Sequence, residues 1–117
     1  MMMRPIVIYN QFDIVKIPFP FNGNDNTKNR PAIVISSTTY QINNNNAILA
    51  MITSLNQSKW LEDIPLTNLE RTGLSSPSKI RLKLFTLDQR FIINKIGELA
   101  ALDRFKLQKH LKQIMLP

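Results

Sequence analysis

Two polar residues stand where apolar strands begin or end, and their chemistry suits a phosphate group. Arg30 directly precedes a strand that Pro31 opens, and Thr53 ends the next strongly apolar run. The planar guanidinium of arginine can bind phosphate through two donors and stabilise extra negative charge in a transition state. A cation at a strand entrance and a hydroxyl at a strand exit can converge on one phosphate. The pair predicts that the protein cuts RNA.

Other catalytic designs are missing from the sequence. It has no cysteine, which excludes disulfides and thiolate metal sites, and its one histidine cannot build a histidine-rich metal centre. That residue, His110, stands beside Lys109 and is interpreted as solvated. With three glycines, no glycine-rich phosphate loop is present. We expect chemistry without metal or cofactor, which RNA permits because its 2′-hydroxyl supplies the nucleophile.

Each polar residue also has a plainer interpretation. Arg30 could be a solvated charge paired with Asp25 or Asp13, a kind of surface contact that contributes ~0–1 kcal/mol. Thr53 could be an ordinary strand residue, although Ser54 beside it adds a second hydroxyl at the strand exit.

Further cations and aromatic residues could contact RNA. The run 79–85 alternates strictly and places Arg81 and Lys83 on one face, as either a basic ladder or a solvated surface. Trp60, Phe21 and Tyr40 could each stack on a base, or could belong to the core or its rim.

The overall charge points to an anionic partner. The chain of 117 residues has a formal net charge of +7, which attracts nucleic acid, an acidic protein tail or an anionic membrane. No segment approaches the ~20 apolar residues of a membrane helix. The length predicts one domain, residues 1–117.

Short strands and one terminal helix must position these residues. The pattern predicts a mainly β fold, a small barrel with an attached C-terminal helix. Strands are predicted at 12–17, 31–36, 47–53, 63–66 and 79–85, a strand or helix at 91–99, a helix at 102–116, loops at 21–29 and 54–62, a polar turn at 43–46 and a Gly/Ser/Pro connection at 71–77.

Several segments, in one consistent order, resemble the MazF/PemK family of toxins from toxin–antitoxin pairs. The similarity covers about residues 12–116. The matching pieces are Asp13-Ile14-Val15, Asn29-Arg30-Pro31-Ala32-Ile33-Val34-Ile35-Ser36, Ile52-Thr53-Ser54, Asp63-Ile64-Pro65-Leu66, Gly73-Leu74, Pro77-Ser78-Lys79-Ile80-Arg81, Thr86-Leu87-Asp88 and Lys95-Ile96-Gly97-Glu98-Leu99.

The resemblance implies a fold and an activity. The fold would be an SH3-like barrel with a C-terminal helix, forming a homodimer. The activity would be metal-independent, sequence-specific cleavage of single-stranded RNA through a 2′,3′-cyclic phosphate, with no cofactor. The implied partner is an acidic antitoxin that covers the basic groove, in a cytoplasmic complex that binds DNA and contacts no membrane.

The resemblance also implies residue roles. Arg30 would stabilise the phosphorane, Thr53 would position the scissile phosphate, and Asp25 is a candidate base. The residues expected to bind RNA are Lys28, Ser54, Gln57, Arg81 and Lys83.

The chain departs from the family pattern at several places, one of which is the segment from Arg81 to Thr86, one residue shorter than the common pattern. Phe12 replaces the usual Gly before the opening Asp, so the first turn should avoid positive φ. Arg81-Leu82-Lys83 replaces Arg-x-Asp, which removes the acidic partner of Arg81. Ala100 replaces the Ser that would cap the last helix, which weakens that cap.

Two alternatives remain at this point. One is a gyrase-poisoning toxin of the same fold, which would cut no RNA and would be indifferent to Arg30 and Thr53. The other is a catalytically inactive protein that binds RNA or an antitoxin.

Overall fold

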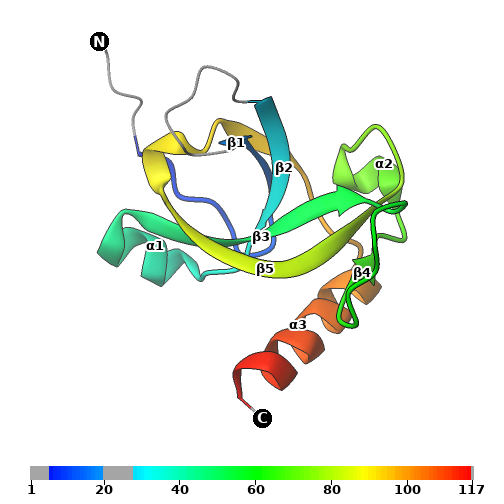
Figure 1. Cartoon of the computed structure of the whole chain (residues 1–117). Coiled ribbons are helices and arrows are strands. Elements are labelled where there is room, and N and C mark those ends of the chain that lie inside the picture. Colours follow the sequence, from blue (N-terminus) through cyan, green and yellow to red (C-terminus); the bar gives the residue numbers. More distant parts are fainter. Residues whose placement is uncertain (1–5, 20–27, 117) are drawn as a thin grey trace.

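The computed structural model describes residues 6–19 and 28–116 and contains one antiparallel sheet of six strands, in the order β4-β5-β3-β2-β1-β6. The sheet curls on itself, and α1 and α2 lie at opposite ends of the molecule (Figure 1). The elements are β1 (Ile14–Phe19), β2 (Lys28–Val34), α1 (Thr38–Asn44), β3 (Asn46–Ser54), β4 (Ile64–Pro65), α2 (Leu69–Thr72), β5 (Ser78–Asp88), the 3-10 turn η1 (Gln89–Phe91), β6 (Asn94–Gly97) and α3 (Ala101–Met115).

Each face of the curled sheet carries a buried hydrophobic cluster. Successive side chains of a strand point to opposite faces, and in β1 Ile14 belongs to one hydrophobic cluster while Val15 belongs to another. A register shift between Ala50 and Met51, opposite β5, interrupts the ladder and bends the sheet. The predicted mainly β fold, a small barrel with a C-terminal helix, is confirmed.

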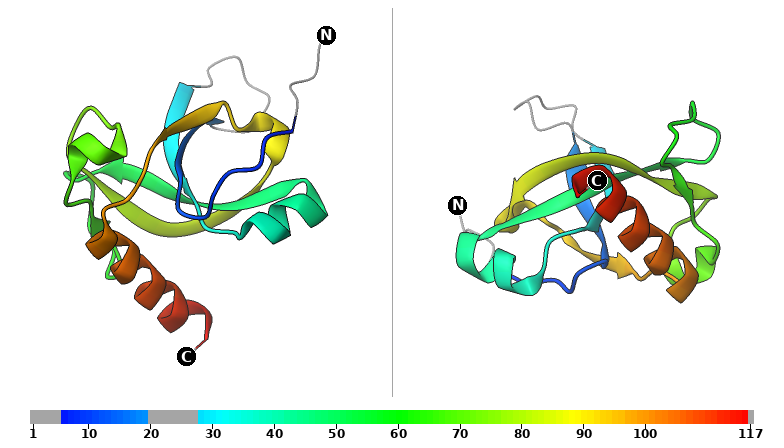
Figure 2. Two further views of the ribbon diagram at one scale, coloured as in Figure 1. Left: turned by 180° about the vertical axis from the view of Figure 1, so that it is seen from behind. Right: turned by 90° about the horizontal axis from the view of Figure 1, so that it is seen from below.

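The terminal helix packs against the barrel through one face. Leu107 is fully buried, and Leu111 packs on the cluster that contains Ile14. Asp103 is also fully buried, and it accepts hydrogen bonds from the amide and the hydroxyl of Thr67, at 2.9 and 3.0 Å. The views in Figure 2 show α3 beside the β4 end of the sheet. As expected, Ala100 provides no side-chain cap.

The predicted polar turn at 43–46 is wrong in part, because α1 occupies its first two residues and β3 begins at its last. Ser37 caps this helix by accepting a hydrogen bond from the Tyr40 amide at 3.1 Å, and Asn45 ends it in a left-handed conformation with φ of 51°. A serine cap and an asparagine at the C-terminus are the sequence signals of a short helix, although the asparagines have poor helix propensity. Helix α2 likewise overlaps the start of the predicted connection at 71–77.

Phe12 corrects a second expectation. Its φ is 72°, so the first turn keeps the left-handed conformation although the residue is not glycine. The strain of roughly 1–2 kcal/mol is offset by burial of the ring, which is 5% exposed, at roughly 1.5–3 kcal/mol. The Phe12 amide also donates to the Val34 carbonyl at 2.6 Å.

The segment 91–99, open between strand and helix, contains the strand β6. No helix within the described residues is long and apolar enough to cross a membrane.

Candidate active site

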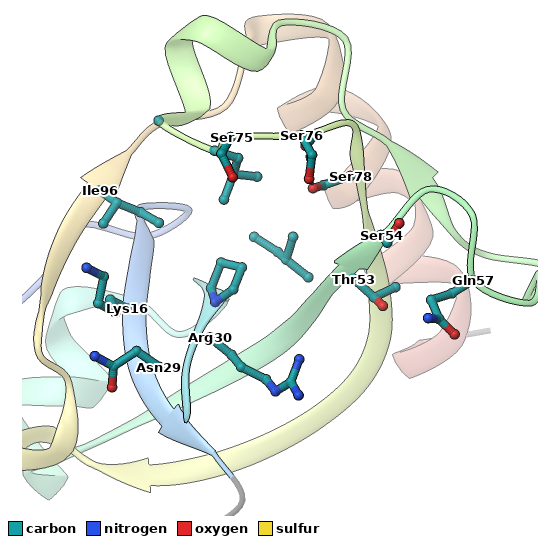
Figure 3. Close-up of a pocket in the computed structure, with 14 residues that line it drawn as sticks. Lys16, Asn29, Arg30, Thr53, Ser54, Gln57, Ser75, Ser76, Ser78 and Ile96 are labelled. Atoms are coloured by element: carbon teal, nitrogen blue, oxygen red, sulfur yellow. Dashed lines mark hydrogen bonds between the residues drawn. The ribbon is translucent and has the colours of Figure 1, made fainter. Parts of the chain in front are cut away.

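A cavity of about 400 Å³ opens between β2, β3, β6 and the segment that joins α2 to β5 (Figure 3). Both residues of the predicted catalytic pair, Arg30 and Thr53, line it. Its other lining residues are Lys16, Asn29, Pro31, Ile52, Ser54, Gln57, Gly73, Leu74, Ser75, Ser76, Ser78 and Ile96.

Arg30 is an exposed cation on β2. It lies opposite Ile17 of β1, and its guanidinium carbon is 6.0 Å from the centre of the Phe19 ring. Within residues 6–19 and 28–116, no carboxylate lies within ion-pair distance of this guanidinium. The side chain extends toward Thr53 and Gln57 (Figure 3). Arg30 is therefore accessible to an anion in the cavity.

Thr53 and its neighbours form the opposite wall. Thr53 is half-buried and pairs with Lys79 of β5, and Ser54 pairs with Ser78. Beyond Ser54 the chain turns, because the Ser54 carbonyl accepts a hydrogen bond from the Gln57 amide at 3.1 Å. This turn brings the Gln57 side chain to the same cavity, so hydroxyl and amide groups face Arg30.

Two glycines set the remaining wall. Gly73 ends α2 with φ of +72°, and a Cβ there would lie 2.0 Å from the Ile96 carbonyl oxygen. A Cβ on Gly97 would lie 2.0 Å from the Thr72 carbonyl oxygen. Backbone therefore packs directly on backbone between α2 and β6, which only glycine allows. The contact holds the Ser75 and Ser76 hydroxyls at the cavity rim.

Asp13, one of the alternative partners of Arg30, is engaged elsewhere. The Lys95 Nζ lies 2.7 Å from Glu98 and 3.2 Å from Asp13, and Glu98 also pairs with Arg71 at 3.3 Å. The hydrogen bond from Lys95 lowers the pKa of Glu98, and the same bond raises the pKa of Lys95. The proposed pairing of Arg30 with Asp13 is thus wrong, while Asp25 lies outside the described residues.

Arg81, expected to bind RNA, does not line this cavity. Its Nε and Nη2 donate to the two carboxylate oxygens of Asp63, at 3.2 and 2.9 Å. The guanidinium also lies 4.9 Å from the centre of the Trp60 ring. The Lys79 Nζ lies 3.1 Å from Asp63 as well. The expected loss of an acidic partner is therefore wrong, because Asp63 supplies one from a distant part of the chain.

Asp63 is ionised by this environment. Desolvation raises its pKa, but hydrogen bonds from Arg81, from the Trp60 amide and from Lys79 lower it more, to about 2. The bonds with Asp63 correspondingly raise the pKa of Arg81.

The remaining predicted site residues have different fates. Lys28 and Lys83 are exposed but do not line the cavity, and Tyr40 lies on α1 away from it. Phe21 lies outside the described residues. The interpretation of His110 as solvated is wrong, because it is half-buried with Nδ1 3.2 Å from the Glu62 carbonyl oxygen.

Sequence reasoning missed several cavity residues, above all Lys16. A signal was available, because Lys16 is the one cation in the otherwise apolar strand β1 and lies opposite Pro31. Asn29 directly precedes Arg30, and the serines 75, 76 and 78 stand in a segment interpreted only as a connection. Among the described residues, no group of three or more His, Asp or Glu could hold a metal ion.

Comparisons with known proteins match both the sequence and the fold. The family model of "PemK-like, MazF-like toxin of type II toxin-antitoxin system" matches residues 10–115. A comparison with curated proteins returned no match.

Solved structures share the fold at low sequence identity. A MazE–MazF complex from Deinococcus radiodurans has a TM-score of 0.73 and 17% identity, over 93% of this chain and 97% of that chain. An endoribonuclease in complex with its cognate antitoxin, from a mycobacterial species, has a TM-score of 0.72 and 10% identity, over 94% and 96%. The toxin MazF-mt6 of Mycobacterium tuberculosis has a TM-score of 0.67 and 19% identity, over 86% and 93%.

Proposed function

The chain belongs to the family of PemK-like, MazF-like toxins of type II toxin–antitoxin systems, and on that premise we propose that it is an endoribonuclease that cuts single-stranded RNA. The observation that carries the proposal is the placement of Arg30 and Thr53 in one cavity. Arg30 has no carboxylate partner among the described residues, so its charge is available to a phosphate. An arginine that forms an ion pair with a carboxylate of the protein would not be available to bind a phosphate.

The proposed reaction is an internal displacement at phosphorus. The 2′-hydroxyl of the nucleotide before the cut loses its proton to a base and attacks the adjacent phosphorus. The bond to the 5′-oxygen breaks, and that oxygen takes up a proton. The products are a 2′,3′-cyclic phosphate and a 5′-hydroxyl, so no metal is required to supply the nucleophile.

The residues act on the charge that develops. Arg30 stabilises the phosphorane oxygens through its two parallel donors. The Thr53 hydroxyl donates to a non-bridging oxygen and orients the phosphate. Asp25 is the candidate base, and it lies outside the described residues.

The RNA chain would enter along the cationic rim. Lys16 and Gln57 line the cavity beside the catalytic pair, and the exposed Lys28 and Lys83 extend positive charge beyond it. Such contacts position the backbone but carry no sequence information by themselves.

We further propose an acidic antitoxin as protein partner and a homodimer as the working form. The net charge of +7 favours an acidic partner. Two of the structural neighbours are toxin–antitoxin complexes, which supports the same proposal.

The test is cleavage of a mixed single-stranded RNA by the purified chain in EDTA, with mapping of both new ends. We expect cyclic phosphate and 5′-hydroxyl ends, and a rate at least ~10²-fold lower for Arg30→Ala. Arg104→Ala is the matched control, because it removes an exposed arginine on α3, outside the cavity.

Two outcomes would contradict the proposal. Equal cleavage by Arg30→Ala would remove the catalytic assignment. If the wild type cleaves no RNA and forms a stable complex with gyrase, the assigned function would be gyrase inhibition instead of RNA cleavage.

A further inference from the structure

The loop between β3 and β4, residues 55–63, forms a partition between two cavities. On one side lies the candidate active site, and on the other lies a second cavity of about 450 Å³ whose lining includes Asp63 and Lys79. Gln57 lines both cavities. Its position therefore depends on what holds this loop.

Residues 56–60 belong to no strand or helix, so no regular hydrogen-bond ladder orders their backbone. Side chains from elsewhere in the fold bind it instead. The Lys79 Nζ donates to the Gln57 carbonyl at 2.7 Å, and Arg81 donates to the Ser58 carbonyl. The Asp63 carboxylate accepts from the Trp60 amide at 2.9 Å. Three peptide groups are thus fixed by one cluster, which we call the Asp63 cluster: Asp63, Lys79, Arg81 and Trp60.

The three charged side chains of the Asp63 cluster are shielded from solvent, while Trp60 and the rest of the loop are exposed. The side chains of Asp63 and Lys79 are each 5% exposed, and that of Arg81 is 13% exposed. Residues 54–61 are all exposed. Charged hydrogen bonds are stronger where water is excluded, so the cluster supplies the order that apolar packing does not give this loop.

Arg81 contributes geometry as well as charge. Its guanidinium binds both carboxylate oxygens of Asp63, donates to the Ser58 carbonyl, and stacks on Trp60. A lysine would keep the positive charge but could not make these contacts together.

We propose that Asp63 and Arg81 are positioning residues that hold Gln57 in the active-site cavity, where its amide reads a base beside the scissile phosphate. An amide presents a donor next to an acceptor and so can pair with two groups on one base edge. Gln57 then selects the RNA sequence that is cut. This inference rests on the proposed endoribonuclease function.

The first arm of the test reads the loop without RNA. Trp60 is the one tryptophan of the chain, so its fluorescence reports on the Asp63 cluster. Arg81→Lys should shift the Trp60 emission to longer wavelength and increase its quenching by acrylamide. Lys83→Ala, which changes an exposed cation on the same strand, should leave both unchanged.

The second arm reads sequence selection with a mixed RNA pool. Gln57→Ala should lower kcat/KM at the preferred sequence by about 10-fold relative to sequences that differ at one base, with Trp60 emission unchanged. Arg81→Lys should give the same loss of selectivity. If Arg81 instead guided the RNA backbone, Arg81→Lys would keep the selectivity. It would change the salt dependence of cleavage for all sequences alike.

The outcomes separate this inference from the proposed function. Unchanged Trp60 fluorescence in Arg81→Lys, or an unchanged cleavage profile in Gln57→Ala, would overturn it. Gln57→Ala alters an exposed side chain, so folding does not confound that result. Absence of cleavage by the wild type would refute the proposed endoribonuclease function and, with it, base recognition by Gln57. In that case the fluorescence measurement alone would decide whether Arg81 holds the loop.

Discussion

Arg30 and Arg81 are two arginines in strand segments of one curled sheet, and the structure gives them different surroundings. Arg30 is exposed at a cavity and has no carboxylate partner among the described residues. Arg81 is bound at both oxygens of Asp63, stacks on Trp60 and donates to the Ser58 backbone. The difference teaches that an arginine can bind a ligand's anionic group only where no carboxylate of the protein already occupies its guanidinium donors.

The substitution with the largest expected effect on the contrast between Arg30 and Arg81 is Asp63→Ala, which removes the carboxylate partner of Arg81. It should lower the free energy of unfolding by roughly 3–5 kcal/mol, because it leaves the buried Lys79 without its counterion. Urea denaturation measures the loss. The control is Glu98→Ala, which breaks exposed ion pairs and should cost under ~1 kcal/mol. Equal losses in the two variants would mean that the Asp63 cluster contributes no more to stability than an exposed ion pair.

The second challenge is Arg30→Lys. The substitution keeps a positive charge but removes the planar fork, so RNA cleavage should fall by roughly 10²-fold. The melting temperature should not change, because Arg30 is exposed. Single-turnover cleavage and a thermal melt together check this. A variant with full activity would show that a point charge suffices at this position.

The third challenge uses pH on the Arg81 side. The pKa of Asp63 is lowered to about 2, below the ordinary 3.8, so its contribution to stability is complete above pH 3.8 and is lost as pH falls toward about 2. The groups that face it are the side chains of Arg81 and Lys79. Trp60 emission should shift between pH 4 and 2 in the wild type.

Asp63→Asn is the control for that titration, because it lacks the ionisation and should show no shift in this range. Asp88 also has a pKa of about 2, set by its hydrogen bonds with Arg90, but it ends β5 away from Trp60. An identical Trp60 shift in Asp63→Asn would assign the transition to other carboxylates.

A smaller effect is expected from Thr53→Val on the Arg30 side. Loss of a hydrogen bond to a charged phosphate should lower cleavage by about 10-fold without changing Trp60 fluorescence. Thr53→Ser keeps the hydroxyl and should restore most of the rate. If the serine variant is as slow as the valine variant, the methyl group of Thr53 matters rather than its hydroxyl.

The smallest expected effect calibrates the others. Ala100→Ser adds the missing N-cap of α3 and should stabilise the protein by ~1 kcal/mol. Neither cleavage nor Trp60 emission should change, because the substitution touches neither arginine. An altered cleavage profile here would mean that global stability, rather than the Asp63 cluster, controls the loop 55–63.

Much of the fold follows from local patterns. Alternation in 79–85 and the apolar runs at 31–36 and 47–53 correspond to β5, β2 and β3. Helix α1 was missed because four consecutive asparagines resemble a turn, while its Ser37 cap and buried Gln41 are the informative features. Phe12 was missed because its left-handed backbone is maintained by core burial, which no local rule reports.

The candidate site was predictable to a different extent on its two sides. Arg30 and Thr53 stood out because each is polar at the end of an apolar strand, and strand pairing places both at one cavity. Arg81 looked equally available, since its partner Asp63 is distant in sequence. Lys16 was missed because a single cation in a strand has many plain explanations.

Local sequence therefore established the strands, the terminal helix, the basic character and the position of the Arg30–Thr53 pair, because periodicity and turn chemistry act over a few residues. The fold in three dimensions assigned the partners of each charge. Whether a cation is free or neutralised depends on which carboxylate lies within a few ångströms and how far water is excluded, and both arise from contacts between distant segments. For that reason Arg30 faces a cavity, whereas Arg81 holds a loop.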